Sequence, residues 1–204
     1  KKTDMGLVCG FPYILKKRHL KLVKYGFLNL HAGLLPKYRG GSPLNWQIIN
    51  NEKFFGISVI KLNREIDGGD IVEEKKFRLL KRYKIEDLHH IANKNFGKML
   101  FKSIIKVLTK KKLNKQLKKN VNYFKQRNIK DSEIIPDKIT FKELKLLDRA
   151  MSKSYPRPFF FHNSNKIIIN KFKIVKIRSK INSNFFRKNN KAFLKIKDNI
   201  IEIK

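Results

Sequence analysis

Three side chains in the first half of the chain are of types that can catalyse group transfer. Asn29 and His31 stand two positions apart at the end of an apolar run, and Asp67 stands in a later turn beside two glycines. An amide can donate a hydrogen bond to a developing oxyanion, an imidazole can move a proton, and a carboxylate can orient or charge the imidazole. If the fold brings the three together, they form a candidate site for a transfer or hydrolytic reaction.

The same three residues also have a structural interpretation, which the residue types alone leave open. Asn and His beside a loop often satisfy backbone groups of that loop. Asp67 begins the run Asp-Gly-Gly-Asp, which suits a tight turn. The elements around these residues must therefore separate the two interpretations.

The elements that would position these residues follow an α/β pattern. Residues 5–11 and 26–31 are short apolar runs typical of buried strands, and the second ends on His31. Strand alternation puts Asn29 and His31 on one face, and ligands bind beyond the carboxyl ends of parallel strands. The other expected elements are a basic turn or short helix at 15–24, a helix capped by Ser42 with Pro43 at its first position, strands at 56–62 and 71–72, and a helix from 86 to about 119.

The remainder of the chain is predicted to form a smaller β-rich domain. Its clearest signal is the pair of alternating runs at 193–197 and 200–203, which predicts a β-hairpin with a two-residue turn at Asp198-Asn199. Before it we expect, in chain order, a polar linker at 120–135, a short helix at 141–151, extended backbone around Pro156 and Pro158, and strand-like alternation at 166–177. The predicted domains are therefore 1–125, which carries the candidate site, and 126–204.

Composition limits the classes of function that remain. Of the 204 residues, 41% are hydrophobic, which is enough apolar material for a folded core. No apolar run is long enough to span a membrane, and no apolar signal stretch precedes the first strand. The single cysteine, Cys9, can form neither an internal disulfide nor a zinc knuckle. A cytoplasmic location without membrane insertion is therefore expected.

The formal net charge of +33 has two explanations. A strongly basic chain can bind nucleic acid, an anionic membrane surface or a phosphate-bearing small molecule. Lysine outnumbers arginine by 39 to 10, however, whereas sites that recognise bases rely on arginine. The excess therefore favours a general compositional bias toward lysine. A basic, non-catalytic nucleic-acid-binding protein stays as an alternative from a different class.

Two motifs in the chain resemble the signatures of the folate-dependent formyltransferase family. The first is FLNLHAGLLPKYRG at 27–40, and the second is GISV at 56–59 followed by IDGGDIV at 66–72. The resemblance extends from residue 4 to about 177. It implies a Rossmann-like domain, truncated here at its N-terminal βα units, that transfers the formyl group of 10-formyltetrahydrofolate to an amine. It also implies that Asn29, His31 and Asp67 are the catalytic residues and that no metal takes part.

The resemblance further implies which residues contact the two substrates. The residues expected to line the pterin pocket are Phe11, Tyr13, Ile14, Leu15, Glu65 and Ile66, and core packing is a nearly equal interpretation of the apolar ones. The residues expected to contact the acceptor are Arg39, Asn45 and Trp46. The departures from the family pattern are Ala32-Gly33, where members often have a residue followed by Ser, and Lys61 and Arg64, where apolar or acidic residues are usual.

The run SPLNW at 42–46 favours one class of acceptor. It resembles the amino-sugar N-formyltransferases, including the UDP-4-amino-arabinose formyltransferase, whereas the methionyl-tRNA formyltransferases usually lack this Trp. The short C-terminal part does not resemble a full tRNA-binding domain. A nucleotide-linked amino sugar is therefore the expected acceptor, with methionyl-tRNA as the alternative and simple packing of Trp46 against the sheet left open. Members of the sugar group are often homodimers.

Overall fold

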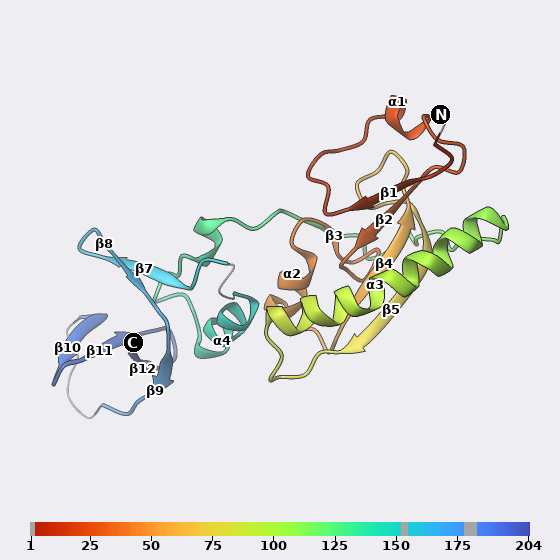
Figure 1. Cartoon of the computed structure of the whole chain (residues 1–204). Coiled ribbons are helices and arrows are strands. Elements are labelled where there is room, and N and C mark those ends of the chain that lie inside the picture. Colours follow the sequence, from red (N-terminus) through yellow and green to blue (C-terminus); the bar gives the residue numbers. More distant parts are fainter. Residues whose placement is uncertain (1–2, 152–154, 178–182) are drawn as a thin grey trace. The chain divides into compact units, whose positions relative to one another are not determined.

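The computed structural model describes residues 3–151, 155–177 and 183–204 (Figure 1). The chain folds into two compact units, one formed by residues 1–126 and the other by residues 127–204. The N-terminal unit combines a sheet with helices, and the C-terminal unit is rich in strands, which confirms the predicted α/β class followed by a β-rich part. None of the helices in the described part is both long and apolar enough to cross a membrane.

The sheet of the N-terminal unit has four strands in the order β1 (Gly6–Cys9), β2 (Phe27–His31), β4 (Phe54–Lys61) and β5 (Asp70–Arg78). The β1–β2 pair is parallel, whereas β4 is antiparallel to both β2 and β5. The β-branched side chains of β4 are fully buried, as expected of a strand with neighbours on both sides. Because β1 and β2 run parallel, their carboxyl ends, and the loops that follow them, lie at one edge of the sheet.

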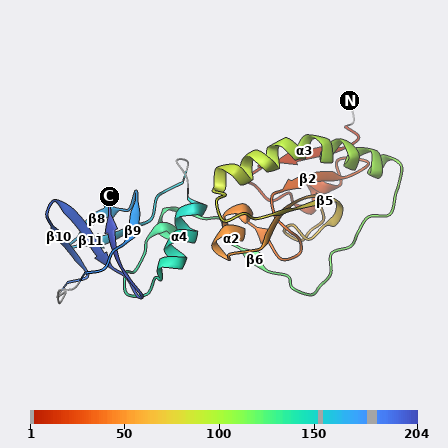
Figure 2. The same ribbon diagram turned by 90° about the horizontal axis from the view of Figure 1, so that it is seen from below.

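The helix α3 (Ile85–Leu108) lies along the sheet and contacts β2, β4 and β5 (Figure 2). Its apolar stripe recurs every three or four residues, and Leu88, Ala92 and Met99 are buried by this contact. The helix ends at Leu108, so the predicted end near residue 119 is wrong. The apolar period stops there, and Lys110 adopts a left-handed backbone (φ 52°) that a helix cannot continue.

Two short helices connect the strands. The basic segment after β1 contains the one-turn helix α1 (Lys17–Leu20), and α2 (Pro43–Ile49) precedes β4. Ser42 stands before α2 with φ 49° and ψ 41°, not in the extended conformation expected of an N-cap residue. The chain leaves β3 (Arg39–Gly40) and enters α2 within two residues, and this sharp change of direction requires the left-handed backbone.

The segment at 120–135 is not a simple linker. Its residues Tyr123–Phe124 form the strand β6, which pairs in parallel with β3. The ring of Phe124 stacks on Tyr38 with the centroids 5.0 Å apart, and this packing holds the segment against the N-terminal unit. Further along the segment, Ile129–Ser132 form a 3-10 turn, which belongs to the C-terminal unit.

The C-terminal unit packs the helix α4 (Phe141–Ala150) with two small sheets. One sheet is the β7 (Phe159–His162) and β8 (Asn165–Ile168) pair, and the other has the order β10 (Phe185–Lys188), β11 (Lys191–Lys195), β12 (Ile200–Ile203) and β9 (Phe172–Ile174). Their shared core consists of Ile134, Leu144, Phe160, Ile169, Leu194, Ile196, Ile201 and Ile203.

The predicted hairpin between β11 and β12 forms, but with a different turn. Leu194 pairs with Ile201, and the backbone N–H of Ile196 donates to the Asn199 carbonyl at 2.8 Å, so the two turn residues are Lys197 and Asp198. The turn is held from outside the hairpin, because Asp198 Oδ1 accepts the backbone N–H of Phe141 at 2.8 Å. The turn is therefore one residue earlier than predicted, and the contact between Asp198 and Phe141 stabilises this register.

Candidate active site

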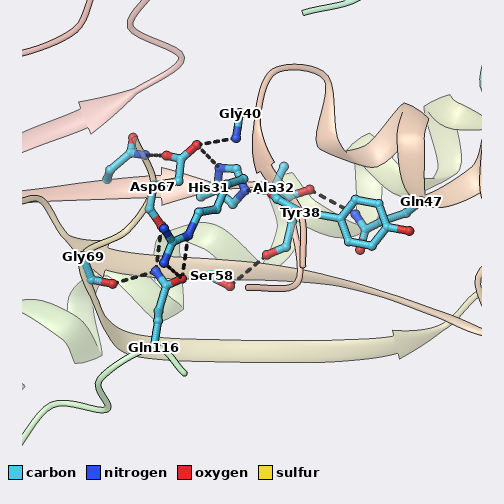
Figure 3. Close-up of polar contacts among 12 residues, drawn as sticks. His31, Ala32, Tyr38, Gly40, Gln47, Ser58, Asp67, Gly69 and Gln116 are labelled. Carbon is cyan, nitrogen blue, oxygen red and sulfur yellow. Dashed lines mark hydrogen bonds and ion pairs between the residues drawn. The ribbon is translucent and has the colours of Figure 1, made fainter. Parts of the chain in front are cut away.

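The structure brings Asn29, His31 and Asp67 together at the carboxyl end of β2 (Figure 3). Strand alternation places Asn29 and His31 on the same face, from which both reach the Asp67 carboxylate. The amide of Asn29 donates to Asp67 Oδ1 at 3.4 Å, and His31 Nδ1 lies 3.5 Å from Asp67 Oδ2. The side chains of His31 and Asp67 are 5% and 13% exposed, so electrostatic interactions between them are weakly screened by water.

The carboxylate of Asp67 is fixed by a third contact. The backbone N–H of Gly40 donates to Asp67 Oδ2 at 2.9 Å, so the loop after β2 and the loop before β5 meet at this side chain. Asp67 itself has a left-handed backbone with φ 49°, which is uncommon for a residue with a side chain. The turn interpretation of Asp67 is therefore correct for its backbone, while its side chain faces Asn29 and His31.

Both ring nitrogens of His31 face acceptors. Nε2 lies 2.6 Å from the Tyr38 carbonyl oxygen, which can only accept, and Nδ1 faces the Asp67 carboxylate. A neutral imidazole has one N–H and would leave a lone pair pointing at one of these oxygens. A proton on Nε2 satisfies the short contact with the Tyr38 carbonyl, and a second proton, on Nδ1, would face the Asp67 carboxylate.

Gly33 allows the contact between His31 and the Tyr38 carbonyl. A Cβ atom at position 33 would lie 2.6 Å from His31 Nε2 and 2.7 Å from the Tyr38 oxygen. Such distances are far below van der Waals contact, so a side chain there would displace the loop or the imidazole. The departure at Ala32-Gly33 from the family pattern therefore falls on the residue that packs directly against His31.

Two buried side chains that the sequence analysis missed hold the loop after β2. Ser58 Oγ donates to the Gly33 carbonyl at 2.9 Å, and Gln47 Nε2 donates to the Ala32 carbonyl at 3.3 Å. Both side chains are fully buried. Ser58 lies on β4 directly opposite His31, and Gln47 comes from α2. No spacing in the sequence links these residues to the loop, because the pairing of β2 with β4 creates their contacts.

Arg39, which was predicted to contact the acceptor, is 5% exposed and is bonded to protein groups. Its guanidinium donates to Gln116 Oε1 from Nε at 3.1 Å and from Nη2 at 2.9 Å. Its Nη1 donates to Tyr123 at 2.8 Å and to Glu65 at 3.2 Å. In this structure Arg39 therefore links the segment after α3 to the loop that carries Asp67, and Gln116 is a further residue of the site that sequence reasoning did not find.

Asn45 and Trp46, also predicted to contact the acceptor, lie on α2. Asn45 is 1% exposed, and the Trp46 indole N–H donates to the Lys125 carbonyl at 3.0 Å. The Trp46 ring packs against Phe124 with the centroids 5.4 Å apart. Packing is thus the role that the structure gives Trp46, although the residue it packs against is in β6 and not in the main sheet.

The residues predicted to line the pterin pocket include several exposed apolar side chains. Phe11, Tyr13 and Ile14 are 52%, 74% and 70% exposed, and Ile66 is 47% exposed, so core packing does not explain them. Phe11, Tyr13 and Ile14 follow β1, whose carboxyl end lies beside that of β2. Leu15 is half-buried, and Glu65 bonds to Arg39. Exposed apolar side chains at this edge suit a flat aromatic ligand, because such a ligand would cover them.

The described part of the chain contains no cluster of side chains suited to binding a metal ion. Within residues 3–151, 155–177 and 183–204, no group of three or more His, Cys, Asp or Glu side chains could hold a metal ion. The groups that the site offers are an amide, an imidazole, a carboxylate and a backbone N–H.

Comparison with known proteins is consistent with this site. The chain is 40% identical over 101 residues to a methionyl-tRNA formyltransferase of Clostridium tetani, covering 50% of this chain and 33% of that protein. It is 36% identical over 188 residues to the bifunctional polymyxin resistance protein ArnA of Wigglesworthia glossinidia brevipalpis, covering 85% and 27%. The chain thus spans a third or less of the length of these two curated relatives.

A solved structure shares the fold over most of the chain. The crystal structure of a 4-N formyltransferase from Francisella tularensis superposes with a TM-score of 0.71 at 27% identity, covering 85% of this chain and 72% of that one. The sequence profile described as formyl transferase matches residues 1–104, which include Asn29, His31 and Asp67. On this match, which covers half of its residues, the chain belongs to the formyl transferase family.

Proposed function

We propose that the protein transfers the formyl group of 10-formyltetrahydrofolate to the amine of a nucleotide-linked amino sugar. The observation that carries this proposal is the convergence of Asn29 and His31 on the Asp67 carboxylate, at 3.4 Å and 3.5 Å, at one edge of the sheet. Family membership supports the formyl transfer. The exposed apolar side chains of Phe11, Tyr13 and Ile14, together with Leu15, Glu65 and Ile66, would hold the folate.

The three residues suit the charge changes of this reaction. The acceptor nitrogen forms a bond to the formyl carbon, and the carbonyl oxygen becomes an oxyanion that needs hydrogen-bond donors. The Asn29 amide nitrogen has two N–H groups, of which one donates to Asp67 and the other can donate to the oxyanion. When the bond between the formyl carbon and the folate nitrogen breaks, the acceptor nitrogen loses its proton. Asp67 would receive this proton through a water and His31 would return one to the departing folate nitrogen.

The choice of an amino sugar has both sequence and structural support. The SPLNW run at the start of α2 resembles the sugar enzymes, and the 4-N formyltransferase of Francisella tularensis shares the fold at 27% identity. A net charge of +33 is compatible with an anionic acceptor of either class, a nucleotide sugar or a tRNA. In the biosynthesis of glycans, including lipopolysaccharide, an N-formylated sugar of this kind would be a building block.

Methionyl-tRNA is the second candidate acceptor. The observation that favours it is the 40% identity over 101 residues to the Clostridium tetani methionyl-tRNA formyltransferase. Similarity to this class extends over most of the chain, since the methionyl-tRNA formyltransferase of Orientia tsutsugamushi is 32% identical over 176 residues and covers 85% of it. Both acceptor classes need the same formyl chemistry at Asn29, His31 and Asp67. Residues other than these three therefore determine which acceptor is used.

A direct competition between acceptors tests the proposal. The purified protein that carries this chain would be incubated with 10-formyltetrahydrofolate and, in parallel, with dTDP-amino sugars, UDP-amino sugars and methionyl-tRNA. We expect a mass increase of one formyl group on an amino sugar, and no such product with the variant His31→Ala. Formylation of methionyl-tRNA without formylation of any amino sugar would overturn the assignment of the acceptor. Tight, salt-dependent binding of random RNA without any transfer would instead support a nucleic-acid-binding protein.

A further inference from the structure

A single glutamine amide joins the segment after α3 to the loop that carries Asp67. Gln116 lies half-buried in that segment, between the exposed residues Lys115 and Leu117. Its Nε2 donates to the Asp67 carbonyl at 2.6 Å and to the Gly69 carbonyl at 2.7 Å (Figure 3). We propose that Gln116 is a positioning residue for formyl transfer, because it fixes the backbone from which the Asp67 carboxylate reaches His31.

The contacts of Gln116 define one orientation of its amide. The oxygen accepts two N–H groups of the Arg39 guanidinium, at 3.1 Å and 2.9 Å, while the nitrogen faces two carbonyl oxygens. A rotated amide would place its oxygen against two carbonyl oxygens and its NH₂ against a guanidinium that can only donate. Both lone pairs of the amide oxygen and both N–H groups of the amide nitrogen are thus directed at Arg39 and the Asp67 loop.

The loop needs this support because of its backbone. Asp67 has φ 49°, a left-handed conformation that is uncommon for residues with a side chain, although Asp adopts it more readily than most. Gln116 binds the carbonyl of Asp67 itself and the carbonyl two residues later. The loop is consequently held on its backbone side by Gln116 and on its carboxylate side by Gly40.

The segment that carries Gln116 is fixed to the rest of the unit on both sides of this residue, and we call Gln116 with its contacts to Arg39, Asp67 and Gly69 the clamp. Two residues before Gln116, Asn114 exchanges backbone hydrogen bonds with Ile71 at 2.8 Å and 3.1 Å. After it, Tyr123–Phe124 pairs with Arg39–Gly40. Arg39 and Gly40, which are neighbours in sequence, therefore act on Asp67 by different routes: Arg39 through Gln116, and Gly40 through the carboxylate. A change at Gln116 is expected to move the carboxylate relative to Gly40 and His31.

This inference rests on the proposed function for its kinetic consequence, but not for its structural one. The structural consequence is visible at the Gly40 amide, whose proton is bonded to Asp67 Oδ2. Arg39-Gly40 is the one Arg-Gly pair in the sequence. Labelling arginine with ¹³C at the carbonyl and glycine with ¹⁵N therefore yields a single carbonyl-filtered amide signal, which reports the Gly40 hydrogen bond in the whole chain.

Two substitutions distinguish the contact of Gln116 with Arg39 from its contacts with the carbonyls of Asp67 and Gly69. Gln116→Met keeps the length of the side chain and removes all polar contacts. Gln116→Glu keeps an acceptor for Arg39 but turns a carboxylate oxygen toward the carbonyls of Asp67 and Gly69. Leu117→Ala, at a neighbour that is 72% exposed, is the matched control, and Asp67→Asn calibrates the signal of a lost carboxylate.

We expect both Gln116 variants to shift the Gly40 amide signal in the direction of Asp67→Asn, with an unchanged signal in Leu117→Ala. In the transfer assay, kcat should fall about 10- to 100-fold in both variants, while the KM values of donor and acceptor change less than about twofold. Because Gln116→Glu keeps the Arg39 contact, an equal loss in the two variants assigns the effect to the carbonyl contacts. Circular dichroism melting verifies that the variants are folded.

Several results would overturn the proposal. These are a Gly40 signal that stays at its wild-type position in folded Gln116→Met, a wild-type kcat in that variant, or a loss that appears only as a higher KM. A wild-type protein that transfers no formyl group to any acceptor would instead contradict the proposed function, and the Gly40 signal would still decide whether Gln116 fixes Asp67.

Discussion

His31 Nε2 lies 2.6 Å from the carbonyl oxygen of Tyr38, on the loop that connects β2 to β3. The imidazole is thus held between a backbone carbonyl and the Asp67 carboxylate, and both of its nitrogens have an acceptor. Donation from Nε2 to an oxyanion requires the bond to the Tyr38 carbonyl to be exchanged for a bond to the substrate. Such an exchange does not involve Nδ1, which faces Asp67.

The role of the carboxylate can be tested with Asp67→Asn. An amide in place of the carboxylate would present an NH₂ group either to the Asn29 amide or to the Gly40 N–H, both of which are donors. We expect the kcat of formyl transfer to fall by about 10²- to 10⁴-fold, since His31 loses its charged partner and the proton loses its acceptor. Steady-state kinetics measure this loss. The exposed Asp4→Asn should leave the rate unchanged, and an unchanged rate in Asp67→Asn would exclude Asp67 from the chemistry.

Asn29→Ala tests the donation to the oxyanion. Removing one oxyanion donor typically lowers kcat by about 10²- to 10³-fold, because the tetrahedral intermediate loses a hydrogen bond that the ground state does not make to the same extent. We therefore expect a fall in kcat of that size with little change in KM. Asn165→Ala, the same substitution at an exposed residue of β8, is the control. A rise in KM without a fall in kcat would show that Asn29 binds substrate in place of stabilising the oxyanion.

Arg39→Lys distinguishes the structural role of Arg39 from the predicted contact with the acceptor. Lysine keeps the charge but cannot bond Gln116, Glu65 and Tyr123 together, because it lacks the planar fork of the guanidinium. We expect the free energy of unfolding in urea to fall by about 1.5–3 kcal/mol, the range for hydrogen bonds to charged groups. The exposed Arg64→Lys should show no such change. If Arg39 instead contacted the acceptor, Arg39→Lys would keep its stability and raise the KM of the acceptor.

The hydroxyl of Tyr38 is a buried donor whose removal should destabilise the loop before β3. It donates to Glu52 at 2.6 Å and accepts from Asn50 at 3.2 Å. Burial raises the pKa of Tyr38 well above its ordinary value, and the hydrogen bond to Glu52 acts in the same direction. We expect Tyr38→Phe to lower the free energy of unfolding by about 1–3 kcal/mol, because Asn50 and Glu52 lose the hydroxyl, although Glu52 keeps its contact with Lys37.

The contribution of the Tyr38 hydroxyl to the free energy of unfolding should also depend on pH. Since its pKa is higher in the folded state, the contribution is complete below the ordinary tyrosine pKa of about 10 and declines as the pH rises above it. Urea unfolding between pH 7 and 11 measures the difference in the free energy of unfolding between wild type and Tyr38→Phe. That difference should be constant up to about pH 10 and then shrink. Tyr13→Phe, at a residue that is 74% exposed, should match the wild type.

The N-terminus of α4 offers a test in the C-terminal unit. Thr140 Oγ1 accepts the Glu143 N–H at 3.2 Å, and the Glu143 carboxylate accepts the Thr140 backbone N–H at 2.8 Å. We expect Thr140→Ala to cost about 1 kcal/mol of stability. The hydrogen bonds from the Thr140 backbone and hydroxyl lower the pKa of Glu143.

Because its pKa is lowered by folding, Glu143 stabilises the unit above the ordinary glutamate pKa of about 4.3 and loses this effect as the pH falls through the lower folded value. The melting temperature of Glu143→Gln should therefore be lower than that of wild type at pH 7, and this difference should shrink toward pH 3. The exposed Glu133→Gln serves as the control and should melt like wild type at both pH values. A difference that grew toward acid pH would contradict the capping role of the carboxylate.

Much of the architecture around the site could be predicted because it depends on local patterns. The apolar runs that became β1, β2 and β4 are short and bounded by glycine or polar residues, and α3 has a helical period over its whole length. Asn29 and His31 share a face because strand alternation puts them there, whatever the rest of the chain does. These features require no contact between distant segments.

Other features depend on contacts between segments far apart in the sequence. The parallel pairing of β3 with β6, the burial of Arg39 and the positions of Ser58 and Gln47 all arise there. Gln116 lies in a lysine-rich stretch with no period that marks it, 49 residues from Asp67. Its role exists only when that stretch folds back over the loop. The types and order of the candidate catalytic residues thus follow from local sequence, whereas the network that holds Asp67 and His31 in place follows from tertiary packing, because hydrogen bonds between distant segments are specified by their geometry in space and not by spacing along the chain.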